Sequence, residues 1–442
     1  MALAQDQAIP TPADPDLAVP SPDKTREARL TGWPLVVIVD RYPLLEQADV
    51  AMELKGLEQR GLRFEIWSLE RPGARKTHPI HGEIAARVRY LPRGFAAEPA
   101  RVLAALLGAL FGRGFLAALA TALRSMGRAP GSHPILNLLQ ACVLNAEAAP
   151  GLRFAYARNM TASGNVARAL ARLRDIGWGF HASEPDVWSI PDFETAERLD
   201  EAAFVLAPSE TVHGNLQGLA PGRDRVLLTR TGLDLGLYSA PLRPVDSRIG
   251  ETEKDAIRLI SVGPLEDRAG YRDLLRALAD VPRGLKWRLT HFGDGPLAAR
   301  LRQYATQLHI APRILWRGPA DQTEVIAAMR EADIFVQTPR PGEGMEHGGI
   351  PFCLLEAASQ KLPILSTRTA AVAQFVIDGE TGILVRAGNA SALAEAIGRL
   401  AHDPAERARL GNAARARVET NHRLGPSLDD LARRLRTAIQ AT

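Results

Sequence analysis

The stretch of this 442-residue sequence that carries the most chemical information is TPRPGEGMEHGGIPFCLLEAASQK, at positions 338–361. It follows an apolar run typical of a strand, passes through a glycine-rich loop and enters a helical pattern at Pro351. Proline suits a first helical position because the N–H that it lacks has no partner within the helix. Gly348 and Gly349 let a ligand approach the backbone, and the first N–H groups of the helix point outward. These features predict a pyrophosphate site.

Glu356 lies five residues into the same helical pattern. A carboxylate at that position can accept hydrogen bonds from both hydroxyls of a ribose whose phosphates lie at the start of the helix. The residues alone leave a second interpretation open. Glycine-rich loops precede helices in many Rossmann-like domains, and Glu356 could equally be a solvated helix residue.

Apolar runs alternate with helical patterns along most of the chain, which predicts parallel sheets with helices on their faces. In the first half, PLVVIVD (34–40) precedes a pattern at 48–61 in which Val50, Leu54 and Leu57 share one helical face. Further strand-like runs lie at 62–69, 153–157, 177–182, 202–208 and 225–230. Residues 239–256 are polar, contain proline and lack periodicity, so we expect a linker there.

The second half repeats the alternation more clearly. Strand candidates lie at 257–263, 286–293, 313–318, 333–339, 363–368 and 382–385. Helix candidates lie at 271–281, 296–308, 322–332, 351–360 and 391–402. Two doubly wound domains joined by a linker place a ligand cleft where the carboxyl ends of both sheets face each other. We therefore expect an α/β fold with an N-terminal domain at 31–238, a C-terminal domain at 257–418 and a final helix at 419–442 that packs back toward the N-terminal domain.

Composition places the chain among ordinary globular proteins, with 46% hydrophobic and 24% charged residues. The 54 basic and 50 acidic residues give a net charge of +4, which is too diffuse to predict nucleic-acid binding. Cys142 and Cys353 each lie in an apolar stretch and indicate buried free thiols in a reducing cytosol. Residues 1–30 are rich in Pro, Asp and Ala without the pattern of a signal peptide, so we expect a disordered leader and a cytoplasmic protein.

The segment 102–123 is nearly long enough to cross a membrane, but Arg113 lies at its centre between Gly112 and Gly114. A central arginine costs roughly 3 kcal/mol on insertion scales, and the glycines favour a break. We expect two short buried or surface helices of the first domain. An interfacial membrane patch and a true span stay open as alternatives. The basic residues that flank the patch are Arg101, Arg124 and Arg128.

GGIPFCLLEAASQKLPILST (348–367) resembles the donor-site signature of family-four glycosyltransferases, the retaining GT-B enzymes, whose motif is usually written E-x7-E. RLISVGPLEDRAGYRDLLRAL (258–278) and HFGDGPLAARLRQYATQLHI (291–310) resemble other segments of their donor domain, and 378–418 resembles their C-terminal run. YARNMTASGNVARALARLRDIG (156–177) and APSETVHGNL (207–216) resemble acceptor-domain segments. The likeness covers nearly the whole chain from residue 34.

The resemblance implies a GT-B fold, in which two Rossmann-like domains face a cleft, and a donor site for a nucleoside-diphosphate sugar. Carried over to this sequence, the donor-contacting positions are Gly263, Arg268, Gly348, Gly349, Ile350, Pro351, Leu355 and Glu356. No cofactor beyond the donor substrate is implied. No metal is expected, because the one DxD-like string, DPD at 14–16, lies in the leader.

The catalytic positions of the family's pattern hold other residues here. Counting eight back from Glu356 places the first carboxylate of the motif on Gly348. Glu343 or Glu346, in the loop just before it, could fold back to replace that carboxylate, or both could be solvated loop acids. The family's TxxGGxPE reads TRTAAVAQFV, with Gln374 in place of the acid.

The cations that neutralise the donor pyrophosphate are also changed. The family's VGRLxxxKG reads VGPLEDRAG, so that Pro264 replaces the arginine and Ala269 the lysine. Arg268 and Arg340 could reach the phosphates instead, or both could be ordinary surface arginines. Retaining transfer needs stabilisation of the departing diphosphate, so these substitutions bear directly on turnover.

In the first domain, WGFHASEPD puts Ser183 where the family places a histidine, with His181 two residues earlier. Residues two apart in a strand face the same side, so His181 could lean toward the cleft, although a core or surface histidine is the plainer interpretation. The candidate catalytic residues are therefore Glu346, Arg268 and Ser183.

Taken together, the sequence predicts a hexosyltransferase-type enzyme that moves a sugar, with retention, from a nucleoside-diphosphate sugar to a glycan or lipid-linked acceptor. The resemblance implies polysaccharide synthesis. The mild basic charge and the segment 102–123 allow peripheral contact at the inner face of a membrane, and we expect no nucleic-acid partner. One alternative is a catalytically silent GT-B protein that binds nucleotide sugar or partners another transferase. Another is an unrelated enzyme on the same architecture, such as a sugar epimerase.

Overall fold

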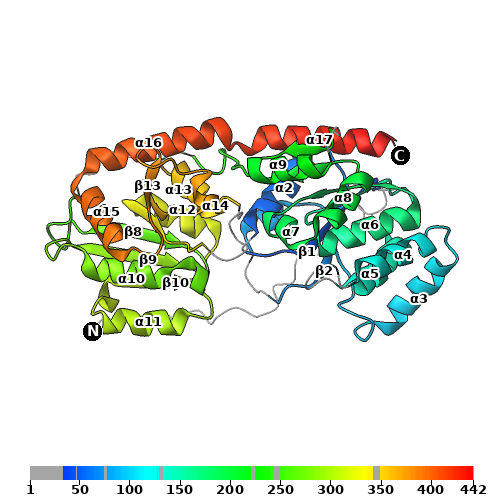
Figure 1. The fold of residues 1–442 in the computed structure, drawn as a ribbon, viewed down its shortest axis with the longest axis horizontal. Helices are drawn as coiled ribbons and strands as arrows, with labels where there is room; N and C mark the ends of the chain where they lie inside the picture. Colours follow the sequence, from blue (N-terminus) through cyan, green and yellow to red (C-terminus); the bar gives the residue numbers. More distant parts are fainter. Residues whose placement is uncertain are drawn as a thin grey trace, which may run out of the picture.

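The protein has two lobes that lie side by side, one built from each half of the chain (Figure 1). The computed structural model describes residues 33–45, 47–73, 77–126, 128, 133–220, 224–239, 241, 248–341 and 349–441. The expected leader at 1–30 and part of the expected linker at 239–256 lie outside these ranges.

The N-terminal lobe is built on a seven-stranded sheet with the order β3-β2-β1-β4-β5-β6-β7, in which the neighbouring strands are parallel. Strands β1 and β4 are apolar and buried, as expected of parallel strands with helices on both faces. Its elements are β1 (Leu35–Arg41), α2 (Ala48–Gln59), β2 (Phe64–Glu70), η1 (Pro79–Glu83), β3 (Val88–Tyr90), α3 (Pro99–Leu110), α4 (Phe115–Ser125), α5 (Pro134–Glu147), β4 (Phe154–Ala157), α6 (Ala162–Arg174), β5 (Gly177–His181), α7 (Glu184–Ser189), α8 (Asp192–Glu201), β6 (Val205–Ala207), α9 (Glu210–Leu219) and β7 (Val226–Leu228).

The C-terminal lobe is built on a six-stranded parallel sheet with the order β10-β9-β8-β11-β12-β13. Its elements are β8 (Ile257–Val262), η2 (Asp267–Ala269), α10 (Tyr271–Asp280), β9 (Trp287–Phe292), α11 (Ala298–Gln307), η3 (Ala311–Arg313), β10 (Ile314–Gly318), α12 (Gln322–Glu331), β11 (Ile334–Gln337), α13 (Phe352–Ser359), β12 (Ile364–Thr367), α14 (Ala370–Ala373), β13 (Gly382–Val385), α15 (Ala390–His402), α16 (Pro404–Asn421) and α17 (Leu424–Ala441).

The predicted α/β architecture is confirmed. Every strand predicted from an apolar run is present, with ends that differ by a few residues, and so are the predicted helices of the second half. The predicted face of α2 is correct, since Val50, Leu54 and Leu57 are all buried. The edge strand β3 was not predicted, because its three half-buried residues form no apolar run.

Residues 102–123 form two helices, α3 and α4, as predicted from the glycines between them. The helices are bent by 116° at the break. Gly114 is required there, because a Cβ at this position would lie 1.8 Å from the carbonyl oxygen of Arg172 on α6. Among the described residues, no one helix has the length and apolarity to cross a membrane, whereas α3 and α4 taken together meet that test.

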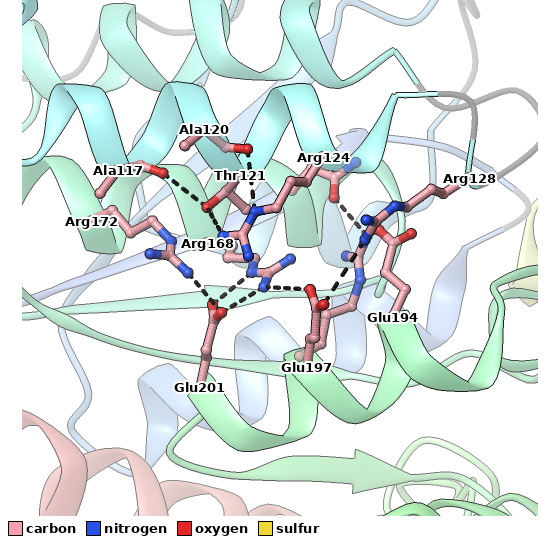
Figure 2. A network of polar contacts seen from close by, with 12 residues as sticks. Ala117, Ala120, Thr121, Arg124, Arg128, Arg168, Arg172, Glu194, Glu197 and Glu201 are labelled. Carbon is pink, nitrogen blue, oxygen red and sulfur yellow. Dashed lines mark hydrogen bonds and ion pairs between the residues drawn. The ribbon is translucent and has the colours of Figure 1, made fainter.

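Ion pairs join α6 to α8, and α8 to the segment after α4, on one side of the N-terminal lobe (Figure 2). The buried Arg168 of α6 donates to both carboxylate oxygens of Glu201, at 2.6 and 2.5 Å, and Arg172 donates to the same carboxylate at 2.6 Å. Glu197 lies 3.6 Å from Arg168 and 3.9 Å from Arg128, which follows α4. The two-oxygen geometry fixes α8 against α6, since paired guanidinium–carboxylate bonds are directional.

The last two helices connect the lobes. Figure 1 shows α16 along the C-terminal lobe and α17 along the N-terminal lobe. Leu428, Leu431, Ala432 and Leu435 of α17 are buried in one apolar cluster with β1, β2 and β4. The C-terminal end of the chain therefore completes the core of the N-terminal lobe.

If α17 completes that core, Leu435→Ala should destabilise the protein by about 2–5 kcal/mol, the usual cost of truncating a buried leucine. Urea titration measures the change, with the exposed Gln440→Ala on the same helix as the matched control. Equal stability of the two variants would show that α17 does not contribute to the folded core.

Candidate active site

Both sheets reverse their strand order beside their first strand, between β1 and β4 and between β8 and β11. Ligands of open parallel sheets bind in the crevice at such a switch point, outside the carboxyl ends of the strands. In the C-terminal lobe, two segments leave the sheet at this point. One begins at Gly263, directly after β8, and the other is the chain that follows β11. Gly263 has a φ of 155°, which an L side chain rarely adopts.

Helix α13 begins close to this switch point. The expectation that Pro351 is the first helical residue was wrong by one position, because Pro351 is the N-cap, with φ −57° and ψ 123°, and the helix begins at Phe352. Gly349 is exposed and Ile350 is half-buried against an apolar cluster. The first N–H groups of a helix lack partners within it, so the start of α13 is suited to an anion.

Glu356 is buried one turn further along α13, with 7% of its surface exposed. One carboxylate oxygen, Oε1, accepts hydrogen bonds from Gln322 Nε2 at 2.8 Å and from the Tyr238 hydroxyl at 3.2 Å. Burial raises the pKa of Glu356 to about 7, and the two hydrogen bonds oppose that rise. Glu356 is therefore not a solvated helix residue but a buried, partnered carboxyl group.

The partners of Glu356 extend to the other lobe. The backbone N–H of Gln322, at the start of α12, donates to His78 Nδ1 at 3.0 Å. Since that nitrogen accepts, the ring proton lies on Nε2, which donates to the carbonyl oxygen of Leu45 at 2.5 Å. Burial lowers the pKa of His78, which keeps the ring neutral. A chain of hydrogen bonds thus runs from Glu356 to the N-terminal lobe.

The two candidate phosphate cations already have acidic partners. Arg268, in η2, has a side chain that is 55% exposed and donates to Glu266 at 2.8 Å. Arg340 donates to both carboxylate oxygens of Asp273, at 2.9 and 2.8 Å. The backbone N–H of Arg340 also donates to the carbonyl oxygen of Arg268 at 2.8 Å, so the two residues lie together.

Ser183 lies in the N-terminal lobe, between β5 and α7, as the N-cap of α7. Its hydroxyl is near the Asp186 carboxylate, which also accepts from the N–H of Met160 at 3.2 Å. Burial raises the pKa of Asp186, and these hydrogen bonds oppose the rise. His181, at the end of β5, has a pKa well below its usual value because of desolvation and the nearby Arg158 charge.

The structure describes only part of the predicted donor site. Glu343, Glu346 and Gly348 lie outside the described residues. Leu355 of α13 is fully buried and belongs to the apolar core against which the helix packs. Cys142 is buried as expected, and Cys353 is half-buried as a residue while its thiol itself is desolvated by burial. Within the described ranges, no group of three or more His, Cys, Asp or Glu residues is placed to hold a metal ion.

Sequence reasoning missed Tyr238, Gln322 and His78. Each contacts Glu356 or its partner only because the chain folds back, and none belongs to a recognisable motif. Tyr238 lies at the end of the N-terminal half and Gln322 opens an otherwise ordinary helix, so spacing alone gave no signal for either residue.

Known proteins resemble this chain in sequence and in fold. Residues 243–417 match the family model described as Glycosyl transferases group 1. The chain is 24% identical over 396 residues to the putative colanic acid biosynthesis glycosyltransferase WcaL of Escherichia coli (strain K12), covering 86% of this chain and 93% of that protein. It is 32% identical over 166 residues to the lipopolysaccharide core biosynthesis glycosyltransferase LpsE of Rhizobium meliloti (strain 1021), covering 38% and 46%.

Solved structures resemble the whole fold. The Anabaena protein Alr3699/HepE in complex with UDP superposes with a TM-score of 0.63 at 15% identity, covering 91% of this chain and 99% of that chain. Sucrose-phosphate synthase from Thermosynechococcus elongatus gives a TM-score of 0.64 at 17% identity, covering 92% and 100%. The fold is therefore GT-B, with two Rossmann-like lobes.

The raised pKa of Glu356 leads to a pH-dependent stability. Between the ordinary carboxyl pKa of 4.5 and the folded value of about 7, the folded protein binds more protons than the unfolded chain. The contribution of this group is thus fully present below pH 4.5 and is lost as the pH rises through about 7. Relative to Glu356→Gln, the free energy of unfolding of the wild type should fall by on the order of 3 kcal/mol from pH 5 to pH 8.

Urea titrations of the wild type and Glu356→Gln at one-unit pH steps measure this difference. The glutamine variant keeps an acceptor oxygen for Tyr238 and Gln322 but has no titrating group. Parallel pH profiles for the two proteins would contradict a raised pKa at Glu356.

Proposed function

We propose that the protein is a retaining glycosyltransferase that moves a sugar from a nucleoside-diphosphate sugar to a glycan or lipid-linked acceptor in polysaccharide synthesis. The observation that carries the proposal is a buried carboxyl group, Glu356, one turn inside a helix that follows β11 at the switch point of the C-terminal sheet. This helix lies in the segment that matches the model of glycosyl transferases group 1. The start of α13 would hold the diphosphate, and Glu356 would accept the ribose hydroxyls. No metal enters this proposal.

The class of acceptor is proposed by analogy with the relatives. WcaL is named for colanic acid biosynthesis and LpsE for lipopolysaccharide core biosynthesis. The alternative of a catalytically silent GT-B protein is less well supported, because these relatives are named as glycosyltransferases. Its supporting observations are the replaced positions Pro264, Ala269 and Ser183.

Positive charge at the donor site would come from the start of α13 and from arginines that leave their present carboxylate partners for the diphosphate. Exposed ion pairs such as Arg268–Glu266 contribute about 0–1 kcal/mol, so releasing Arg268 toward a diphosphate costs little. The Arg340–Asp273 pair is bidentate and Asp273 is buried, so releasing Arg340 costs more. We therefore assign the role of neutralising the departing diphosphate to Arg268, with the start of α13 as the fixed positive partner.

We expect calorimetry to detect binding of UDP or GDP and a loss of about 100-fold or more in Glu356→Ala, because hydrogen bonds to a charged acceptor are worth roughly 1.5–3 kcal/mol each. Hydrolysis of the matching nucleotide sugar should be lost in the same variant. Glu395→Ala, which removes an exposed helical carboxylate from the same lobe, is the control.

Two results would decide against this proposal. Unchanged nucleotide affinity in Glu356→Ala would remove the ribose assignment. Nucleotide binding without turnover of any sugar donor, under conditions in which a positive-control transferase is active, would favour the silent alternative.

We also propose that the tip formed by α3 and α4 rests on an anionic membrane surface. Phe111 is 92% exposed and Leu116 is 76% exposed, with the exposed Arg113 between them. Leu103, Leu107 and Leu110 of α3 are exposed on adjoining turns. Figure 1 places both helices at the outer end of the N-terminal lobe, away from the C-terminal lobe. Apolar side chains with arginines beside them suit an interface with anionic lipid.

Co-sedimentation with vesicles of phosphatidylglycerol and phosphatidylcholine tests this contact. The double variant Phe111→Ser, Leu116→Ser should bind at least about tenfold more weakly, since burying each such side chain is worth roughly 1.5–3 kcal/mol. Leu315→Ser, at an exposed leucine of the other lobe, serves as the control. Equal binding by both variants would place the membrane contact elsewhere or exclude it.

A further inference from the structure

Polar side chains replace apolar ones where three strands of the C-terminal sheet end. Ser261 of β8, His291 of β9 and Gln337 of β11 lie at or near the carboxyl ends of neighbouring strands. Ser261 and His291 are fully buried. Parallel strands covered on both faces are normally apolar throughout, so three polar residues at one edge indicate a function for that edge.

This cluster carries hydrogen-bonding atoms without partners. Tyr271, which opens α10, is 97% buried, and its ring meets the His291 ring edge to face at 4.6 Å. Within the described part of the chain, Tyr271 Oη, His291 Nε2 and Gln337 Oε1 are buried and have no hydrogen-bond partner. Native proteins leave few such atoms unsatisfied, and those that remain call for an explanation.

Neither tautomer of the neutral His291 ring gives both ring nitrogens a hydrogen-bond partner. Ser261 Oγ and His291 Nδ1 are 2.8 Å apart, so this pair uses one ring nitrogen whichever atom holds the proton. Nε2 is unpaired in both cases. Burial lowers the pKa of His291 to about 4, so the group adds hydrogen-bonding capacity to the site but no charge at neutral pH. Ser261 also lies close to Tyr271, without a hydrogen bond of good geometry between the two hydroxyls.

Two glycines, Gly263 and Gly293, lie close to these atoms. A Cβ on Gly263 would lie 3.0 Å from Tyr271 Oη and 3.8 Å from Gln337 Nε2. A Cβ on Gly293 would lie 3.3 Å from His291 Nε2. The unpaired atoms therefore adjoin the backbone turns at the ends of β8 and β9.

The same cluster reaches the start of α13. Burial raises the pKa of the Cys353 thiol to about 12, and the adjacent Gln337 side chain opposes that rise. Cys353 is the second residue of α13, three positions before Glu356. The polar cluster thus lies between Gly263 and the helix start that the proposed function assigns to the diphosphate.

We propose that Tyr271, His291 and Gln337 form a neutral polar floor of the donor site, in which the Tyr271 hydroxyl and the protonated Nε2 of His291 donate to the diphosphate of the nucleotide. Gln337 Oε1 only accepts, so it would be linked to the diphosphate through one buried water molecule. The inference rests on the proposed function and deepens it. Pro264 and Ala269 are uncharged and supply no cation for the diphosphate. The hydroxyl of Tyr271 is a neutral donor that can hydrogen-bond a phosphate oxygen. A water molecule here would accept and donate among the unpaired atoms and present its remaining hydrogen to the ligand.

The change Tyr271→Phe removes only the hydroxyl, and so tests whether that hydroxyl binds the ligand or supports the fold. Calorimetry would compare wild type and variant for UDP, GDP and the matching monophosphates, with thermal unfolding measured in the absence of nucleotide. We expect diphosphate affinity to fall about ten- to a hundredfold, with a smaller loss for the monophosphate. The unliganded melting temperature should be unchanged or higher, because the change removes a hydroxyl that has no partner. Gln337→Leu should behave in the same way, and Tyr304→Phe on α11 is the matched control.

Three results would overturn the inference. One is wild-type diphosphate affinity in both Tyr271→Phe and Gln337→Leu, and a second is an equal loss for monophosphate and diphosphate. The third is a loss of affinity matched by a fall in unliganded melting temperature, which would mark a structural role. If Glu356→Ala abolishes nucleotide binding while Tyr271→Phe does not change it, the proposed function stands and only the polar floor is wrong. If the wild type binds no nucleotide, both fail.

Discussion

The burial of one carboxyl group, Glu356, constrains the arrangement of this molecule. A buried carboxyl needs polar partners, and here they are the Tyr238 hydroxyl and the Gln322 amide. Gln322 is held in turn by His78 of the opposite lobe. The junction of the lobes is therefore organised around a group of the C-terminal lobe. A ligand that engages Glu356 must share it with Tyr238 and Gln322 or displace them, so binding and lobe contact are physically linked.

Topology explains why these groups can meet. Each sheet reverses its strand order beside its first strand, and the chain leaves both sheets there at the carboxyl ends. An apolar cluster joins Ala51, Met52 and Ile80 of the N-terminal lobe to the core under α13, and α17 returns to complete the N-terminal core. The site is thus positioned from both sides by apolar contacts, while its polar groups remain at the strand ends.

Much of the fold could be predicted because its signals are local. Continuous apolar runs marked the strands, and the glycines around Arg113 marked the break between α3 and α4. The position of Glu356 on a helix was equally local, but its burial was not, since Tyr238 and Gln322 are distant in sequence. Leu355 shows a limit of prediction by resemblance. The resemblance assigned it to the donor site, yet a residue adjacent to Glu356 on a helix points about 100° away, here into the core.

The unpaired atoms of Tyr271, His291 and Gln337 bear on how this site handles charge. Folded proteins are stable by only about 5–15 kcal/mol, and each buried unsatisfied group costs about 1–3 kcal/mol. Of the three, Tyr271 Oη and His291 Nε2 can donate, which is consistent with a site that uses neutral donors where Pro264 and Ala269 supply no cation. Such donors act only at contact, whereas a cation attracts a phosphate over several ångströms. Under the proposed function, recognition at this site would depend on the fit of the diphosphate against the strand ends more than on long-range attraction. Arg268 would then be the mobile charge that follows the departing group.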